Sequence, residues 1–247
     1  MIKKTMWSPI TSIFLLAALS SLSACSDAEE NVSKNKIEAA PAIQEQVVTT
    51  NKAQGTEVVL KDVTGLYKKL PTPQPTSTGD KIEVLEVFWY GCPHCYHFEP
   101  VLDKWLDEKP AYIEFVRMPG ILGKNWLPHA RAFYAAEKLG VLDMIHKPLF
   151  DAIHNDKRKI LDEKSLRVFF SEYGVSGDEF DQAYNSKEVE EKVKAAFTAG
   201  QGYALTGVPA IIINGKYGTS ASIAGSFEKV IDVINTLAAK EYKELNE

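Results

Sequence analysis

Two cysteines separated by two residues, in the stretch FWYGCPHCYHFEP (88–100), constrain this chain more than any other feature. They follow an apolar run typical of a buried strand, and Pro93 suits the first turn of a helix. A disulfide between Cys92 and Cys95 would close almost no loop, so it would remove little entropy from the unfolded chain. A structural staple is therefore a poor explanation for the pair. A chemical role and a metal-binding role remain to be weighed.

The position of Cys92 at the start of the predicted helix favours its thiolate. Unpaired backbone N–H groups and the positive end of the helix dipole face the sulfur, and such surroundings lower the pKa of a cysteine. We predict that Cys92 is the reactive sulfur and that Cys95 is the more buried partner that completes the disulfide. Pro93 and His94 lie between them. A protonated His94 would stabilise the thiolate and make the disulfide more oxidising.

The strand KIEVLEVFWY (81–90) carries an acid, Glu86, where burial is expected on both faces. A buried carboxylate is costly unless it is protonated or paired. Two interpretations of Glu86 remain open: it relays the proton of the Cys95 thiol, or it is a structural acid with a partner. On the helix that follows, Glu99 is expected to be a solvated charge and His97 a surface residue.

A strand–helix–strand unit and a later hairpin enclose an all-helical block. The second strand of the unit is predicted at 111–118, and the length of the unit implies a parallel pair with a right-handed crossover. Apolar residues at helical spacing follow it. The dipeptide Asn214-Gly215 then predicts a tight hairpin turn with positive φ, and Ser226 is the expected N-cap of a terminal helix.

A CxxC motif that opens the first helix of such a unit is typical of a thioredoxin-like fold. We therefore predict an α/β protein with a thioredoxin-like fold and an inserted all-helical domain. The expected boundaries are 57–118 for the first part of the thioredoxin-like domain, 119–196 for the helical insertion, and 197–247 for the second part.

The segment TGVPA places a proline, Pro209, directly before the predicted strand AIIINGKY. A proline cannot donate to a strand ladder, so a simple strand-start proline is one explanation. The other is functional: in thioredoxin-like proteins the matching proline is cis and faces the cysteines. Val208 would then offer its backbone to an extended substrate peptide.

The N-terminal residues have the composition of an export signal. Lys3 and Lys4 precede a short apolar run, which is too short to span a bilayer. The sequence LSAC (22–25) resembles a bacterial lipobox, which predicts a lipoprotein signal peptide over 1–24 and a lipid on Cys25. An ordinary signal peptide that ends near a cysteine is the alternative. Residues 25–56 read as the lipidated cysteine and a flexible tether.

Three stretches together, FWYGCPHCYHFE, KPLF and GVPAIIINGKY, resemble the DsbA family of bacterial thiol oxidases. The resemblance extends from about residue 57 to the C-terminus. It implies a donor of disulfides to newly exported proteins that is reoxidised by a quinone-linked, DsbB-like membrane protein. It implies no cofactor beyond the redox-active disulfide. The family's functional positions correspond to the redox pair Cys92 and Cys95, the dipeptide Pro93-His94, the cis-proline segment Val208-Pro209 and the buried acid Glu86.

Two features depart from the soluble members of that family. One is the lipobox with its long tether. The other is Arg117, the only base on the strand where some members have a lysine near the buried acid.

Other function classes are less consistent with the sequence. A disulfide isomerase or reductase of the same fold is the nearest rival, but the tether does not resemble a dimerisation domain. A Cu(I)- or Zn²⁺-binding envelope lipoprotein would need a third ligand beside the two thiolates, and none is evident. With 28 basic and 33 acidic residues, the chain has no basic excess for nucleic acid.

Overall fold

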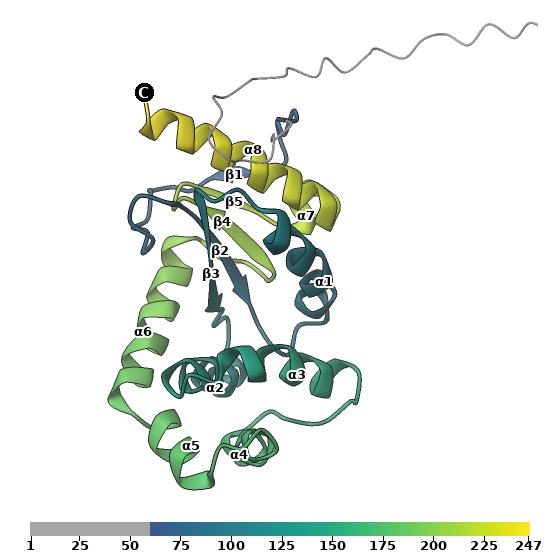
Figure 1. The fold of residues 1–247 in the computed structure, drawn as a ribbon, viewed down its shortest axis with the longest axis vertical. Coiled ribbons are helices and arrows are strands. Elements are labelled where there is room, and N and C mark those ends of the chain that lie inside the picture. The colour runs from purple at the N-terminus through teal and green to yellow at the C-terminus, as the bar shows by residue number, and fades with distance from the viewer. Residues whose placement is uncertain (1–59) are drawn as a thin grey trace, which may run out of the picture. The chain divides into compact units, whose positions relative to one another are not determined.

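The computed structural model describes residues 60–247. Its centre is a five-stranded sheet in the order β1-β5-β4-β2-β3 (Figure 1). The strands are β1 (Lys68–Lys69), β2 (Ile82–Phe88), β3 (Ile113–Pro119), β4 (Ala210–Ile213) and β5 (Tyr217–Thr219). Strand β2 pairs in parallel with β3 and antiparallel with β4. This arrangement confirms the predicted parallel unit and places the later hairpin on the other side of β2.

Strand β2 is the most deeply buried element of the sheet, because every one of its residues is buried. Its apolar and β-branched residues suit a strand that is covered on both faces. The parallel neighbour is reached through α1 (Pro93–Glu108), which crosses over the sheet. The redox motif therefore lies where the central strand ends and the crossover helix begins.

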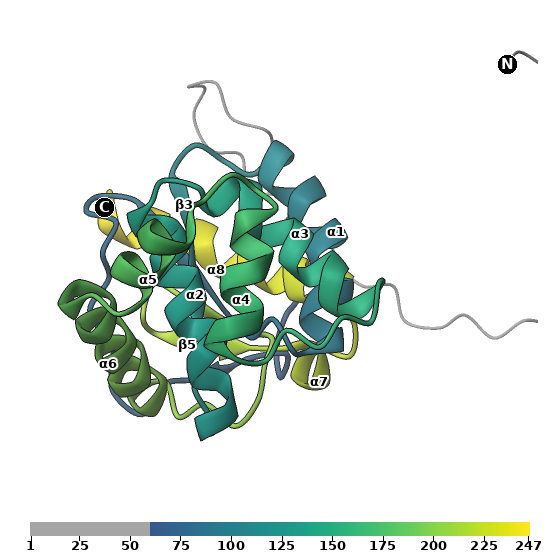
Figure 2. The same ribbon diagram turned by 90° about the horizontal axis from the view of Figure 1, so that it is seen from below.

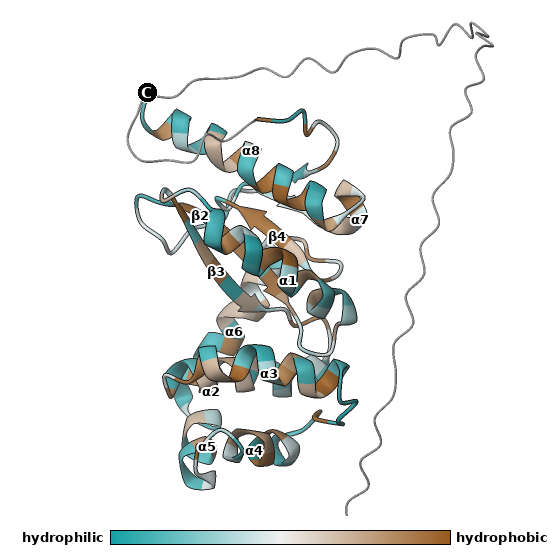
Figure 3. Ribbon diagram, turned by 45° about the vertical axis from the view of Figure 1, so that its right-hand side comes forward, coloured by the Kyte–Doolittle hydropathy of each residue, from teal (hydrophilic) through white to brown (hydrophobic). Residues whose placement is uncertain are grey.

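Helices cover both faces of the sheet. On one face, α1 and α8 (Phe227–Leu245) pack on Ile82 and Val84 of β2 and on the apolar side of β4, and Figure 3 shows the hydrophobic strand β4 beneath α8. On the other face, α6 (Lys187–Gly202) packs on Leu85 and Val87. The alternation of β2 side chains thus gives each helix layer its own set of contacts.

The remaining helices form a block at the end of β2. The helices of the block are η1 (Lys124–Trp126), α2 (Leu127–Lys138), α3 (Leu142–His154), α4 (Glu163–Ser171) and α5 (Gly177–Tyr184). The short α7 (Ala221–Ala224) is not part of it and packs against α8. Figure 2 views the protein from the side of this block. Phe88, Tyr90 and Cys95 belong to the same apolar cluster as the buried residues of α2 to α5. The block therefore forms one wall behind the cysteine pair.

The predicted fold class is confirmed: a thioredoxin-like sheet with an all-helical insertion. The hairpin turn at Asn214 and Gly215 has positive φ at both residues, and Ser226 caps α8 by accepting a hydrogen bond from the backbone of Lys229. The expected boundary at residue 196 falls inside α6. The predicted signal peptide, the lipid on Cys25 and the tether to residue 56 lie outside the described residues.

No helix among residues 60–247 is both long enough and apolar enough to cross a bilayer.

Candidate active site

The two cysteines lie at the N-terminus of α1 in different surroundings. Cys92 is the N-cap residue, with extended backbone geometry, and Pro93 occupies the first position of the helix. Both cysteines are unbridged thiols in the structure. The side chain of Cys92 is 8% exposed and that of Cys95 is fully buried. An incoming thiolate would therefore meet Cys92 first.

The pKa values of the two thiols are shifted in opposite directions. A side-chain hydrogen bond from Cys95 lowers the pKa of Cys92 to about 6, and backbone hydrogen bonds from Cys95 and His94 and the charge of His94 act in the same direction. Burial raises the pKa of Cys95 far above its ordinary value, and the neighbouring Cys92 and the charge of Glu86 add to the increase. The site therefore stabilises a thiolate on Cys92 and a protonated thiol on Cys95.

The segment before β4 lies directly against the reactive sulfur. The peptide bond between Val208 and Pro209 is cis, and Cys92 Sγ donates a hydrogen bond to the carbonyl oxygen of Val208 at 3.4 Å. Gly120 supports this position from behind, because a Cβ atom there would lie 3.1 Å from Val208 Cγ1. The backbone of Val208 is thus brought to the sulfur, as the resemblance implies.

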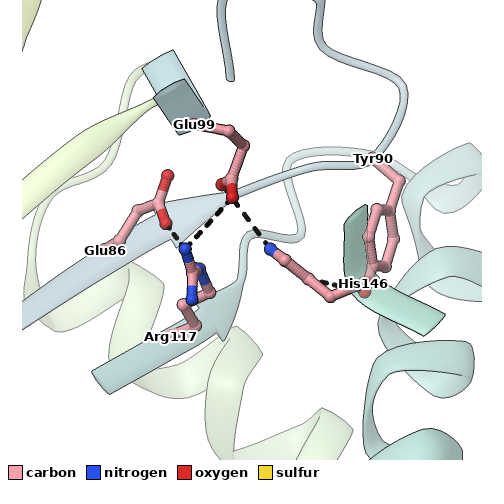
Figure 4. A network of polar contacts seen from close by, with 5 residues as sticks. All are labelled: Glu86, Tyr90, Glu99, Arg117 and His146. Atoms are coloured by element: carbon pink, nitrogen blue, oxygen red, sulfur yellow. Dashed lines mark hydrogen bonds and ion pairs between the residues drawn. The ribbon is translucent and has the colours of Figure 1, made fainter. Parts of the chain in front are cut away.

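Glu86 is buried and paired. Its Oε2 accepts a hydrogen bond from Nε of Arg117 at 3.1 Å, and Nη2 of the same guanidinium donates to Glu99 Oε2 at 3.1 Å (Figure 4). The parallel register of β2 and β3 places Glu86 directly opposite Arg117. The other oxygen of Glu86, Oε1, is buried and has no partner among the described residues. Of the two open interpretations, the pairing is thus observed, and it leaves one oxygen available for a proton.

The expectation that Glu99 is a solvated charge is wrong. Its side chain is only 5% exposed. Glu99 follows Cys95 by four residues, so both lie on the same face of α1, and that face is turned towards Arg117 rather than towards water. Two carboxyl groups and one guanidinium therefore share the interior beside the cysteine pair.

The two carboxyl groups have opposite pKa shifts. Burial raises the pKa of Glu86 to about 8, and the charge of Glu99 adds to the increase while Arg117 opposes it. Burial also raises the pKa of Glu99, but the neighbouring His146 imidazole and the charge of Arg117 outweigh this and hold the pKa below its ordinary value. Because a single guanidinium compensates the two carboxyl groups, the pKa of one is raised, and the raised pKa belongs to Glu86.

Two members of this network, His146 and Tyr90, could not be recognised in the sequence. His146 Nδ1 lies 2.9 Å from the Tyr90 hydroxyl, and its Nε2 lies 3.5 Å from Glu99 Oε1. His146 comes from α3, in an apolar stretch where a satisfied core histidine is the ordinary expectation. The only available signal was a histidine in the interior stripe of an amphipathic helix.

A pair of stacked indoles stands next to the cysteines. Trp89 and Trp126 lie 4.4 Å apart between ring centroids, with an interplanar angle of 10°. Gly91 makes this possible, because a Cβ atom at that position would lie 2.4 Å from the Trp89 ring. Trp89 therefore lies where its fluorescence should respond to the redox state of the two cysteines.

His94 and His97 are both exposed. Within the described part of the chain, no three His, Cys, Asp or Glu side chains are grouped so as to hold a metal ion.

Comparison with known proteins shows the family of this chain. Residues 83–231 match the family described as a DSBA-like thioredoxin domain. The chain is 37% identical over 175 residues to the thiol:disulfide interchange protein DsbA of Pseudomonas aeruginosa, which covers 71% of this chain and 83% of that protein. The DsbA of Azotobacter vinelandii is also 37% identical, over 71% of this chain and 82% of its own length.

Solved structures agree with this comparison. The crystal structure of Pseudomonas aeruginosa DsbA has a TM-score of 0.70 at 36% identity, covering 74% of this chain and 95% of that chain. The oxidoreductase DsbA from Xylella fastidiosa has a TM-score of 0.67 at 34% identity, covering 71% of this chain and 94% of its own.

Proposed function

The chain belongs to the DsbA family of thiol:disulfide oxidoreductases, and we propose that Cys92 and Cys95 form the disulfide that it donates to reduced polypeptides. The observation that carries this assignment is the asymmetry of the two thiols. The pKa of Cys92 is lowered to about 6, whereas that of the buried Cys95 is raised. A stable Cys92 thiolate stabilises the reduced enzyme, so the disulfide is a strong oxidant.

The transfer takes place in two exchange steps. A client thiolate attacks Cys92 Sγ, the new S–S bond forms there, and the electron pair of the old bond passes to Cys95 Sγ. Cys95 then takes up a proton, because its environment disfavours the thiolate. A second client thiolate attacks the client sulfur of the mixed disulfide, which completes the client's disulfide and releases Cys92 as a thiolate. The client loses two electrons and the enzyme gains them.

Glu86 is proposed as the source of the proton for Cys95. Its Oε2 is engaged by Arg117, whereas its Oε1 is unpaired. The carboxyl is close enough for its charge to raise the pKa of Cys95. A protonated Glu86 can therefore give up its proton when the Cys95 thiolate is released, without bringing water into the core.

Val208 and Pro209 are proposed to hold the client backbone. An extended client segment can add to the main chain before β4, as in other cases of strand addition. Such contacts use backbone groups and tolerate many client sequences. The hydrogen bond from Cys92 to the Val208 carbonyl supports this, since a client cysteine bound there would be next to the attacked sulfur.

The cellular location and the partners that we propose for the enzyme rest on its N-terminal sequence and on the family resemblance. We propose export by the signal peptide 1–24, a lipid anchor on Cys25, and a tether that lets the enzyme act on the periplasmic face of a membrane. The reoxidising partner would be a quinone-linked, DsbB-like membrane protein. If the lipid is the anchor, Cys25→Ser moves the protein from the membrane pellet to the soluble fraction. A variant that still sediments with membranes would remove this part of the proposal.

The function itself is tested with a reduced, unfolded client that contains one cysteine pair. Stoichiometric oxidised enzyme should convert the client dithiol to a disulfide and accumulate as the dithiol form. Cys92→Ala should abolish this conversion, and Cys25→Ser should leave it intact. Retention of the enzyme disulfide in the presence of excess client dithiol would contradict the proposal.

A further inference from the structure

A buried histidine lies beside the carboxyl pair without a role in the exchange steps. His146 Nε2 and Glu99 Oε1 are both buried, and neither has a conventional hydrogen bond among residues 60–247. They face one another at 3.5 Å. Figure 4 shows His146 pointing from α3 towards Glu99, on the opposite side of that carboxyl from Arg117. Helix α3 thus contributes one side chain to a network that otherwise comes from α1, β2 and β3.

The contacts of His146 determine its tautomer. Burial keeps the phenol of Tyr90 protonated by raising its pKa well above the ordinary value, so its hydroxyl can donate to His146 Nδ1 at 2.9 Å. Burial also lowers the pKa of His146, so the imidazole is neutral at neutral pH. A neutral ring that accepts at Nδ1 carries its hydrogen on Nε2. That hydrogen is directed at Glu99.

The guanidinium contacts of the two carboxyl groups are alike, whereas Lys147 lowers the pKa of Glu99 and Asp103 raises that of Glu86. Arg117 donates to Glu86 and to Glu99 at the same distance, 3.1 Å. The donor that distinguishes the two carboxyl groups is His146, which acts on Glu99 only. The other charged or titratable groups that influence the network are Asp103 on α1, Lys147 on α3 and the two thiols.

We propose that His146 is a positioning residue of the redox centre: its Nε2–H favours the ionised form of Glu99, so that the single proton of the carboxyl pair rests on Glu86, beside Cys95. Without this donor, two carboxyl groups that share one guanidinium would compete for the proton. The proton would then spend part of its time on Glu99. The inference deepens the proposed function, because it explains why the proton donor is Glu86.

The location of the proton can be measured without any client. The reduced protein is labelled with ¹³C at the glutamate side-chain carboxyl carbons, and the spectra are followed across the pH range. The signals are assigned with Glu86→Gln and Glu99→Gln. In the unsubstituted protein, the step near pH 8 should appear on Glu86 alone. In His146→Leu the same step should appear on both carbons, with part of the Glu86 amplitude moved to Glu99.

Two further variants change the contact between His146 and Glu99 to different extents. His146→Gln keeps an N–H donor near the position of Nε2 and should retain the step on Glu86. Tyr90→Phe removes the donor to Nδ1, frees the ring to change tautomer, and should move part of the step to Glu99. The matched control is His129→Gln, another buried histidine, which contacts the carbonyl of Ile160 and no carboxyl group. It should leave the titration unchanged.

The proposal is overturned if the step stays wholly on Glu86 in folded His146→Leu or Tyr90→Phe protein, or if it belongs to Glu99 in the unsubstituted protein. Since His146→Leu and Tyr90→Phe are both tested, loss of folding in one of them leaves the other to decide the outcome. A failure of client oxidation would be seen in the separate activity assay, so the two outcomes are distinguishable.

Discussion

The sulfur of Cys92 lies 3.4 Å from the carbonyl oxygen of Val208, although 116 positions separate the two residues in the sequence. The contact brings together the start of α1 and the cis-proline segment before β4. One segment supplies the reactive sulfur and the other supplies a backbone carbonyl beside it. A client bound to the second is therefore delivered to the first, which is the basis for the following predictions.

Replacing the buried cysteine should trap the first exchange product. In Cys95→Ala the mixed disulfide between Cys92 and a client cannot be resolved by the enzyme, because no second thiol is present next to it. Incubation with a client whose single cysteine is activated as a mixed disulfide with 2-thiopyridine, which leaves as the thiolate, should give a covalent adduct on a non-reducing gel. Cys92→Ala is the matched control and should give none, since Cys95 is fully buried. Adducts formed equally by both variants would show that Cys95 is also accessible.

The reactivity of Cys92 should depend on pH with a midpoint near 6. Alkylation follows the thiolate fraction, and the pKa of Cys92 is lowered to about 6. The rate of alkylation of the reduced protein by iodoacetamide should therefore reach a plateau at neutral pH, with Cys95 unmodified. His94→Leu should move the midpoint to higher pH, because the His94 charge contributes to the shift. A midpoint at about 8.5, the ordinary value for a cysteine, would contradict the assignment.

The buried carboxyl should make the folded state less stable as the pH rises. Burial raises the pKa of Glu86 to about 8 in the folded protein, from 4.5 when it is unperturbed. Protonated Glu86 therefore makes its full contribution to the free energy of unfolding below the pKa that it has in the unfolded state. That contribution is lost as the pH rises through the pKa that Glu86 has in the folded state. Between about pH 5 and pH 8 the free energy of unfolding should fall relative to Glu86→Gln, by at most about 1.4 kcal/mol per pH unit.

This comparison is made on the oxidised proteins, by denaturant unfolding, so that the thiols do not titrate.

The variant Glu86→Gln also tests the proton relay. If Glu86→Gln exchanges disulfides at the unsubstituted rate at every pH, Glu86 is a structural acid only, even where the stability curves differ as expected.

The chemistry of Cys92 was accessible from the sequence because it depends on local structure. A helix that begins at Pro93 determines which cysteine faces the helix N-terminus. The same is true of the turn at Asn214 and Gly215, where local backbone preference specifies the geometry. The fold class followed from the order of such local elements.

The carboxyl network could not be predicted in this way, because it depends on the packing of four elements, α1, β2, β3 and α3. Glu99 is a charged residue on a helix, and nothing local distinguishes it from a solvated one. Its burial results from the guanidinium of Arg117 on β3 and from His146 on α3. The pairing of Glu86 with Arg117 further requires the register of β2 and β3, which the sequence does not specify.

The central claim is that this protein is a disulfide donor, and its equilibrium with glutathione tests that claim most directly. The protein is equilibrated in buffers of varied ratio of reduced to oxidised glutathione, and the redox state is followed by the fluorescence of Trp89. Because the Cys92 thiolate stabilises the dithiol form, the account predicts that the protein is already half reduced in mixtures where oxidised glutathione predominates. Persistence of the disulfide until reduced glutathione predominates would identify a reductase or an inert bridge, and would contradict the account.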